Sequence, residues 1–167
     1  DIFDYSFTAD RNRTIAICRE MRKRKLDLLW ACRSRIDIDR ELLERYSEGL
    51  IAMSGCVAGE IPQLLLAGNM ETAFLRAREY ESIFGAGNFY LEVQDHGLEM
   101  EKRVCQDMFR LSDETGIPLI ASNDAHYIRK EDAAVHDVLL CIQTGKVVKD
   151  EERLRFSGSE FYVKSAA

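Results

Sequence analysis

Short apolar runs alternate with helix-like segments along the whole chain, and this alternation is the feature that most constrains its fold. Five runs have the length and composition of buried strands. Between them, apolar residues recur every three to four positions, which is typical of amphipathic helices. The expected strands are residues 2–7, 26–31, 50–53, 88–93 and 118–122.

Capping residues mark the expected helices. Asp10 or Thr8 precedes a helix that should run to about residue 25, and Asn69 precedes one that should run to about residue 84. Gly116 and Gly145 follow two more, and such glycines commonly end helices. The expected helices are residues 10–25, 39–48, 61–66, 69–84, 99–115 and 130–143.

This order predicts a single α/β domain with a parallel sheet of about five strands and alternating helices. An open sheet and a fragment of a β/α barrel produce the same pattern, so both stay open. Five strand–helix units are too few to close an eight-stranded barrel, and an open sheet leaves two edges unpaired. A homodimer that covers these edges is therefore the alternative to a compact open sheet.

Charge and cysteine content limit the function classes. The net charge is −6 and the pI about 5.2, whereas a nucleic-acid-binding domain usually carries a basic field, so nucleic acid binding is not expected of this piece alone. No run is long and apolar enough to cross a membrane. The five cysteines are dispersed without a CxxC pair, which predicts a reducing, cytoplasmic setting.

Residues that can carry chemistry follow the expected strands. Because the carboxyl ends of parallel strands share one edge, these residues should form one rim. Asp124 and His126 lie two apart, so in an extended chain both would point to the same side and could share a metal ion. The alternative is a capped loop in which Asp124 caps the next helix and His126 packs. The rim residues are Arg35, Cys56, Glu60, Asp95, His96, Asp124 and His126.

Basic residues crowd the last turns of the first expected helix, from Arg19 to Lys25. They could hold a phosphate group. The alternative is a solvated helix end whose positive charge complements the helix dipole.

From about residue 39 to residue 165, within an expected segment 39–167, the chain resembles the PHP (polymerase and histidinol phosphatase) domain of bacterial replicative DNA polymerase III alpha subunits. The segments that carry the resemblance are residues 48–62, 89–97, 120–127, 136–145 and 156–165. PHP domains are distorted β/α barrels with a metal centre at the strand ends, and Cys56, Asp124 and His126 match ligand positions of that centre. The other ligands of the family belong to an amino-terminal half that has no counterpart here. The resemblance therefore implies a single zinc ion at most, with His96, Glu60, Asp95 and Arg35 as further rim residues.

Residues 1 to about 37, within an expected segment 1–38, resemble a different family, the inner βαβ piece of a radical SAM enzyme barrel. The resemblance rests on residues 4–13, 17–21 and 28–37, and the counterpart of Arg35 lies near the cofactor in that family. The cluster-binding CxxxCxxC motif is absent, so no iron–sulfur cluster is expected. Two barrel families that meet near residues 37–39 predict an engineered chimera, with a natural fusion as the alternative.

The sequence thus favours a recombined β/α scaffold with a residual PHP-type metal site and no catalytic residues. Two other functions compete with it. One is a metal-dependent phosphoesterase or nuclease of PHP type, and the other is a structural module of the replicative polymerase alpha subunit.

Overall fold

A small parallel sheet lies at the centre of the fold. The computed structural model describes residues 7–28, 32 and 40–165. Its strands are β1 (Ala52–Met53), β2 (Phe89–Val93) and β3 (Leu119–Ala121), and they lie in the order β1-β2-β3. Both pairs are parallel, with Ala52 opposite Phe89 and Leu91 opposite Leu119. The carboxyl ends of the three strands therefore meet at one edge of the sheet.

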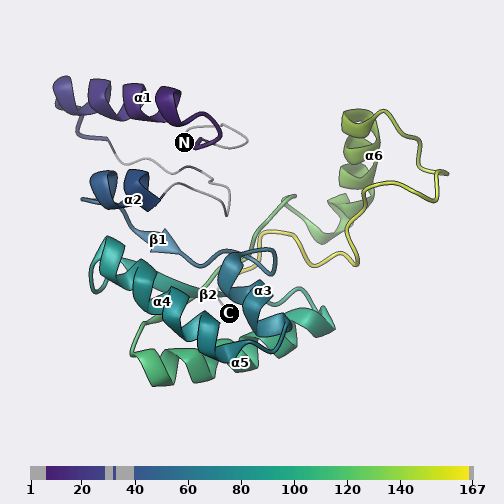
Figure 1. Ribbon diagram of the computed structural model, residues 1–167. Coiled ribbons are helices and arrows are strands. Elements are labelled where there is room, and N and C mark those ends of the chain that lie inside the picture. Colours follow the sequence, from purple (N-terminus) through teal and green to yellow (C-terminus); the bar gives the residue numbers. More distant parts are fainter. Residues whose placement is uncertain (1–6, 29–31, 33–39, 166–167) are drawn as a thin grey trace.

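Three helices pack together beside this sheet, namely α3 (Glu60–Leu66), α4 (Met70–Phe84) and α5 (Glu99–Thr115) (Figure 1). Phe89 and Leu91 alternate along β2 and are buried against them. Burial of apolar area contributes about 25 cal/mol per Å², so burial of this cluster stabilises the central unit. Its buried members are Ile61, Leu65, Ala73, Ala77, Phe89, Leu91, Val104, Met108, Leu111 and Ile117.

The expected helix boundaries are confirmed where a cap defines them. The Asp10 side chain accepts a hydrogen bond from the Arg13 amide at 3.0 Å and starts α1 (Arg11–Lys23). Asn69 does the same for α4 through the Thr72 amide, at 3.2 Å. Gly116 ends α5 with φ 72°, in the left-handed region that glycine adopts without strain.

Two parts of the chain lie beside the central unit rather than within it. Helices α1 and α2 (Arg40–Tyr46) contact each other on the side of β1. At the other end, the short η1 (Lys130–Asp132) leads into α6 (Ala133–Thr144), which projects away from α3, α4 and α5 (Figure 1). The chain after α6 runs back toward the sheet.

Within the described residues, the sheet has fewer strands than the sequence predicts. The three later strands are confirmed, but five strands are not. The first expected strand lies almost wholly outside the described residues, as does the second half of the run at 26–31. Residues 26–28 have no regular structure, and Leu26 and Leu28 are exposed. None of the described helices has the length and apolar character needed to span a membrane.

Candidate functional site

Polar side chains connect all three strand ends at the carboxyl edge of the sheet. The Glu92 carboxylate accepts hydrogen bonds from the Ser122 hydroxyl and from the Gln94 amide, the latter at 3.0 Å. Gln94 also donates to Ser122 at 2.9 Å. The Glu92 amide donates to the Ser54 hydroxyl, just after β1, at 2.8 Å. This network fixes the exits of β1, β2 and β3 relative to one another.

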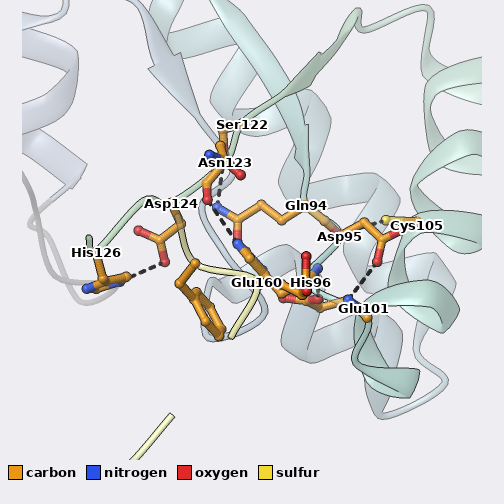
Figure 2. Close-up of polar contacts among 12 residues, drawn as sticks. Gln94, Asp95, His96, Glu101, Cys105, Ser122, Asn123, Asp124, His126 and Glu160 are labelled. Atoms are coloured by element: carbon orange, nitrogen blue, oxygen red, sulfur yellow. Dashed lines mark hydrogen bonds and ion pairs between the residues drawn. The ribbon is translucent and has the colours of Figure 1, made fainter. Parts of the chain in front are cut away.

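A buried histidine–carboxylate pair lies beside this network (Figure 2). His96 Nδ1 is 2.7 Å from Glu101 Oε1, and the His96 amide donates to Glu101 Oε2 at 2.7 Å. The two side chains are 1% and 3% exposed. His96 Nε2 lies 2.9 Å from the carbonyl oxygen of Asn123. Because that oxygen can only accept, Nε2 carries a hydrogen, and the pair joins the exits of β2 and β3 to α5.

The C-terminal segment closes over this pair. The Phe161 ring stacks on His96 with centroids 4.0 Å apart and planes 14° apart. The Asn123 side-chain amide donates to the Tyr162 carbonyl at 2.5 Å, and the His126 amide donates to the Phe161 carbonyl at 2.8 Å. Glu160 pairs with Lys130, whose ammonium group holds the pKa of that carboxyl below its usual value. The C-terminal segment is therefore held by Asn123 and His126, which follow β3, and by Lys130.

Asp124 and His126 meet, as the sequence predicts, but along a different backbone path. Asp124 Oδ2 is 3.4 Å from His126 Nε2, and Figure 2 shows the carboxylate directed at the imidazole. The chain is not extended there, because Asp124 has φ 36°, in the left-handed region. A non-glycine residue in that region is strained, and such strain is often found at functional sites. The two side chains are 30% and 24% exposed, so this pair is open to solvent.

The third expected ligand does not join them. Cys56 lies in the 54–60 turn, where its carbonyl accepts from the Gly59 amide at 2.7 Å, and its neighbours across a narrow gap are Glu101 and Cys105. In the described part of the chain, no three His, Cys, Asp or Glu side chains are grouped closely enough to hold a metal ion. Cys56, Asp124 and His126 as placed here therefore do not form a preassembled site for the single zinc ion that the sequence predicts.

The remaining rim residues have separate roles. Glu60 accepts from the Tyr80 hydroxyl at 2.6 Å and pairs with Arg76 at 3.0 Å, so it joins α3 to α4. Burial, together with Glu60, raises the pKa of Tyr80. Asp95 is exposed and caps its own turn by accepting from the Gly97 amide at 2.8 Å. Arg35 lies outside the described residues.

Glu101 is the site residue that sequence reasoning missed. It lies on the buried face of α5, in line with Val104, Met108 and Leu111. A glutamate at such a position needs a partner, because an unpaired buried charge is costly. The position of Glu101 on the apolar face of the helix could therefore have marked it as a site residue, although it does not identify His96 as the partner.

Comparison with known proteins agrees with part of the sequence interpretation. Residues 15–96 match the sequence pattern of the PHP domain. The chain is 47% identical over 129 residues to the DNA polymerase III subunit alpha of Treponema pallidum and 47% identical over 128 residues to that of Thermus aquaticus. The subunit of Saccharopolyspora erythraea is 43% identical over 130 residues. These matches cover 77–78% of this chain but only 10–11% of the relatives, so the chain spans about a tenth of their length.

The comparisons give a different result for the second resemblance, the one to a radical SAM enzyme barrel. The PHP match begins at residue 15, inside the segment that resembles a radical SAM barrel. The comparisons support neither that resemblance nor a chimera. They support the polymerase relationship, since the three alpha subunits are 43–47% identical over 77–78% of this chain. The chain is thus homologous to a part of bacterial DNA polymerase III alpha subunits, and its residues 15–96 carry the pattern of the PHP domain.

Proposed function

We propose that this chain acts as a non-catalytic structural module of a bacterial replicative DNA polymerase alpha subunit. The observation that carries the proposal is the identity of 47% over 129 residues to such a subunit. The strand-end contacts support it, because Glu92, His96 and Glu101 are bound to other protein groups and are not free to act on a substrate.

A domain replacement tests this proposal. The matching stretch of the Thermus aquaticus alpha subunit is exchanged for residues 39–167 of this chain, and primer extension is measured. A structural module should preserve extension, and the same exchange with Glu101→Ala should lower the thermal stability of the hybrid. A hybrid that folds but does not extend primers would exclude the structural role. The matched control is the exchange with Glu99→Ala, which changes an exposed carboxylate on the same helix.

The second candidate function is metal-dependent phosphoester hydrolysis. It is favoured by one observation, the solvent-open Asp124–His126 pair at the exit of β3. Turnover should stay near background because no third metal-capable side chain joins the pair among the described residues. The test is hydrolysis of a generic phosphate ester and of single-stranded DNA with added zinc or manganese. Turnover that Asp124→Asn abolishes would show that the chain is an enzyme and would contradict the structural-module proposal.

A single zinc ion at Cys56, Asp124 and His126 stays a prediction. Two of the donors already meet, and the thiolate and imidazole groups favour zinc over magnesium. Binding requires the 54–60 turn to bring Cys56 to the pair. Zinc titration of the wild type and of Cys56→Ala tests whether Cys56 is a ligand. Equal zinc affinities of the two proteins would exclude it.

The recombined scaffold and the cytoplasmic setting are also proposals. All five cysteines are free thiols, as expected in a reducing compartment. The scaffold hypothesis requires residues 1–38 to be dispensable for folding. Deletion of that segment should then leave the cooperative unfolding transition of residues 39–167 unchanged.

A further inference from the structure

A basic groove runs along α1 where this helix packs against α2. It consists of two adjoining cavities of about 380 and 270 Å³. The first follows the early turns of α1 and the second its last turns, and both are lined by Arg45 and Tyr46 of α2. Since α1 has 13 residues that each rise 1.5 Å, the groove is about 20 Å long.

Positively charged side chains line this groove. Residues 11–25 hold seven basic side chains and one acidic side chain, Glu20, which is already paired with Arg24 at 2.6 Å. Arg19, Arg22 and Lys25 follow one another at three-residue spacing along the groove wall. Within the residues that the structure describes, none of their side chains forms an ion pair. They therefore offer a row of cations in which Arg19 and Arg22 are neighbours on α1 and Lys25 follows just after the helix end.

In the part of the chain that the structure describes, two acidic side chains line the groove. Glu41 lines the first cavity, but it is 3.2 Å from the Arg11 guanidinium. Glu48 lines the second cavity. Among the described lining residues the cations thus outnumber the carboxylates, so the local charge of this part of the groove is positive even though the whole chain carries −6. A local positive field attracts phosphate groups whatever the total charge.

An aromatic ring lies at the junction of the two cavities. Tyr46 contributes to both, and the Arg45 guanidinium lies over its ring at 5.7 Å from the centroid. Rows of cations with an interleaved aromatic ring are the usual means by which proteins hold single-stranded nucleic acid, because the cations follow the phosphates and a base stacks on the ring. An acidic polypeptide would use the cations but has no need of the ring.

We propose that the α1–α2 groove binds a single strand of nucleic acid, with phosphates on Arg19, Arg22 and Lys25 and a base stacked at Tyr46. The choice of nucleic acid over an acidic polypeptide rests on Tyr46 and, in part, on the proposed function in a polymerase. The groove lies on α1 and α2, and its contacts do not involve the Asp124–His126 pair or the strand-end network.

The test measures binding of a fluorescein-labelled oligothymidylate of twelve nucleotides to the full 167-residue chain by fluorescence anisotropy. The groove variant is Arg19→Gln/Arg22→Gln/Lys25→Gln, which removes three charges and keeps good helix formers. The control variant, Arg103→Gln/Lys146→Gln/Lys149→Gln, removes three exposed charges elsewhere. The groove variant should bind at least about tenfold more weakly. Its slope of log affinity against log salt should fall by about 2, from ~0.7 per lost phosphate contact. The control should differ from the wild type by less than about twofold.

A second pair of variants tests the stacked base. Tyr46→Ala should weaken binding roughly tenfold, and Tyr46→Phe should not. Circular dichroism checks that each variant keeps its helices, and Arg45→Gln replaces any variant that does not fold.

Equal losses in the groove and control variants would overturn the proposal. So would polyglutamate binding as tightly as the oligonucleotide with no effect of Tyr46→Ala, which would assign the groove to acidic polypeptides. A negative result in the oligonucleotide binding test does not change the outcome of the domain replacement, so the groove proposal and the structural-module proposal are tested independently.

Discussion

The His96–Glu101 pair gives the most direct test of what holds the strand ends together. Glu101 accepts two hydrogen bonds from one residue, at the backbone amide and at Nδ1 of His96. Both side chains are excluded from solvent. In Glu101→Ala, neither donor has an obvious replacement partner, and a gap is left beneath the exit of β2.

The expected cost follows from these contacts. A buried donor that loses its acceptor costs about 1–3 kcal/mol, and Glu101→Ala removes the partner of both the backbone amide and Nδ1 of His96. Total stabilities of domains are about 5–15 kcal/mol, so Glu101→Ala should remove a large part of the free energy of unfolding. Glu99→Ala makes the same change on the same helix, where Glu99 is exposed and pairs only with Lys102. Its cost should be about 0.5 kcal/mol.

Urea denaturation followed by far-UV circular dichroism measures both variants. Limited proteolysis adds an independent readout, because Phe161 stacks on His96 and the C-terminal segment should become cleavable when that ring moves. A difference of less than about 1 kcal/mol between Glu101→Ala and Glu99→Ala, with unchanged proteolysis, would refute the view that this pair holds the site together.

Two further predictions concern the 54–60 turn and α6. Gly59→Ala should destabilise the fold by about 1–3 kcal/mol, since a Cβ there would lie 2.3 Å from the Ser54 carbonyl oxygen, and thermal unfolding measures the loss. Asp137 makes a bidentate ion pair with Arg153, which holds the pKa of the carboxyl below its usual value. The stabilisation is therefore present at neutral pH and lost as the pH falls through the lowered pKa. Melting temperatures at pH 7 and pH 3 should differ less for Asp137→Asn than for the wild type, and an equal difference would contradict this assignment.

Local features of the fold could be predicted because their causes lie within a few residues. Asp10, Asn69 and Gly116 end or begin helices through contacts three or four residues away. Apolar composition alone predicted strands less reliably than capping residues predicted helix ends. Residues 26–28 have the composition of a strand, but they lack a neighbouring strand among the described residues and stay exposed.

The site depends on contacts that sequence spacing does not encode. The partners of His96 come from α5, from the exit of β3 and from Phe161, which is 65 residues further along the chain. The meeting of Asp124 with His126 was predicted, but the left-handed backbone at Asp124 was not. Cys56 matched a ligand position in sequence, yet the described residues do not gather it with the pair, because the short 54–60 turn holds it beside α5.

Helix α6 allows a matched comparison of two adjacent leucines. Leu140 is 7% exposed and Leu139 is 56% exposed. Leu140→Ala should cost about 2–4 kcal/mol, because it leaves a cavity, whereas Leu139→Ala should cost less than about 1 kcal/mol. Equal losses in a monomeric protein would show that α6 packs differently from the structure.

The exposed face of α6 also bears on the proposed homodimer. Val135, Val138, Leu139 and Ile142 recur at helical spacing and are all exposed, although apolar side chains in such a row are usually covered. If a second copy covers this row, the mass in solution is that of a dimer, Leu139→Ala costs more than its exposure in one chain allows, and Leu139→Lys shifts the mass to that of a monomer. Light scattering after size exclusion, across a hundredfold concentration range, separates the two cases. A monomer mass throughout would exclude the dimer, and a dimer mass that Leu139→Lys leaves unchanged would exclude this face as the interface.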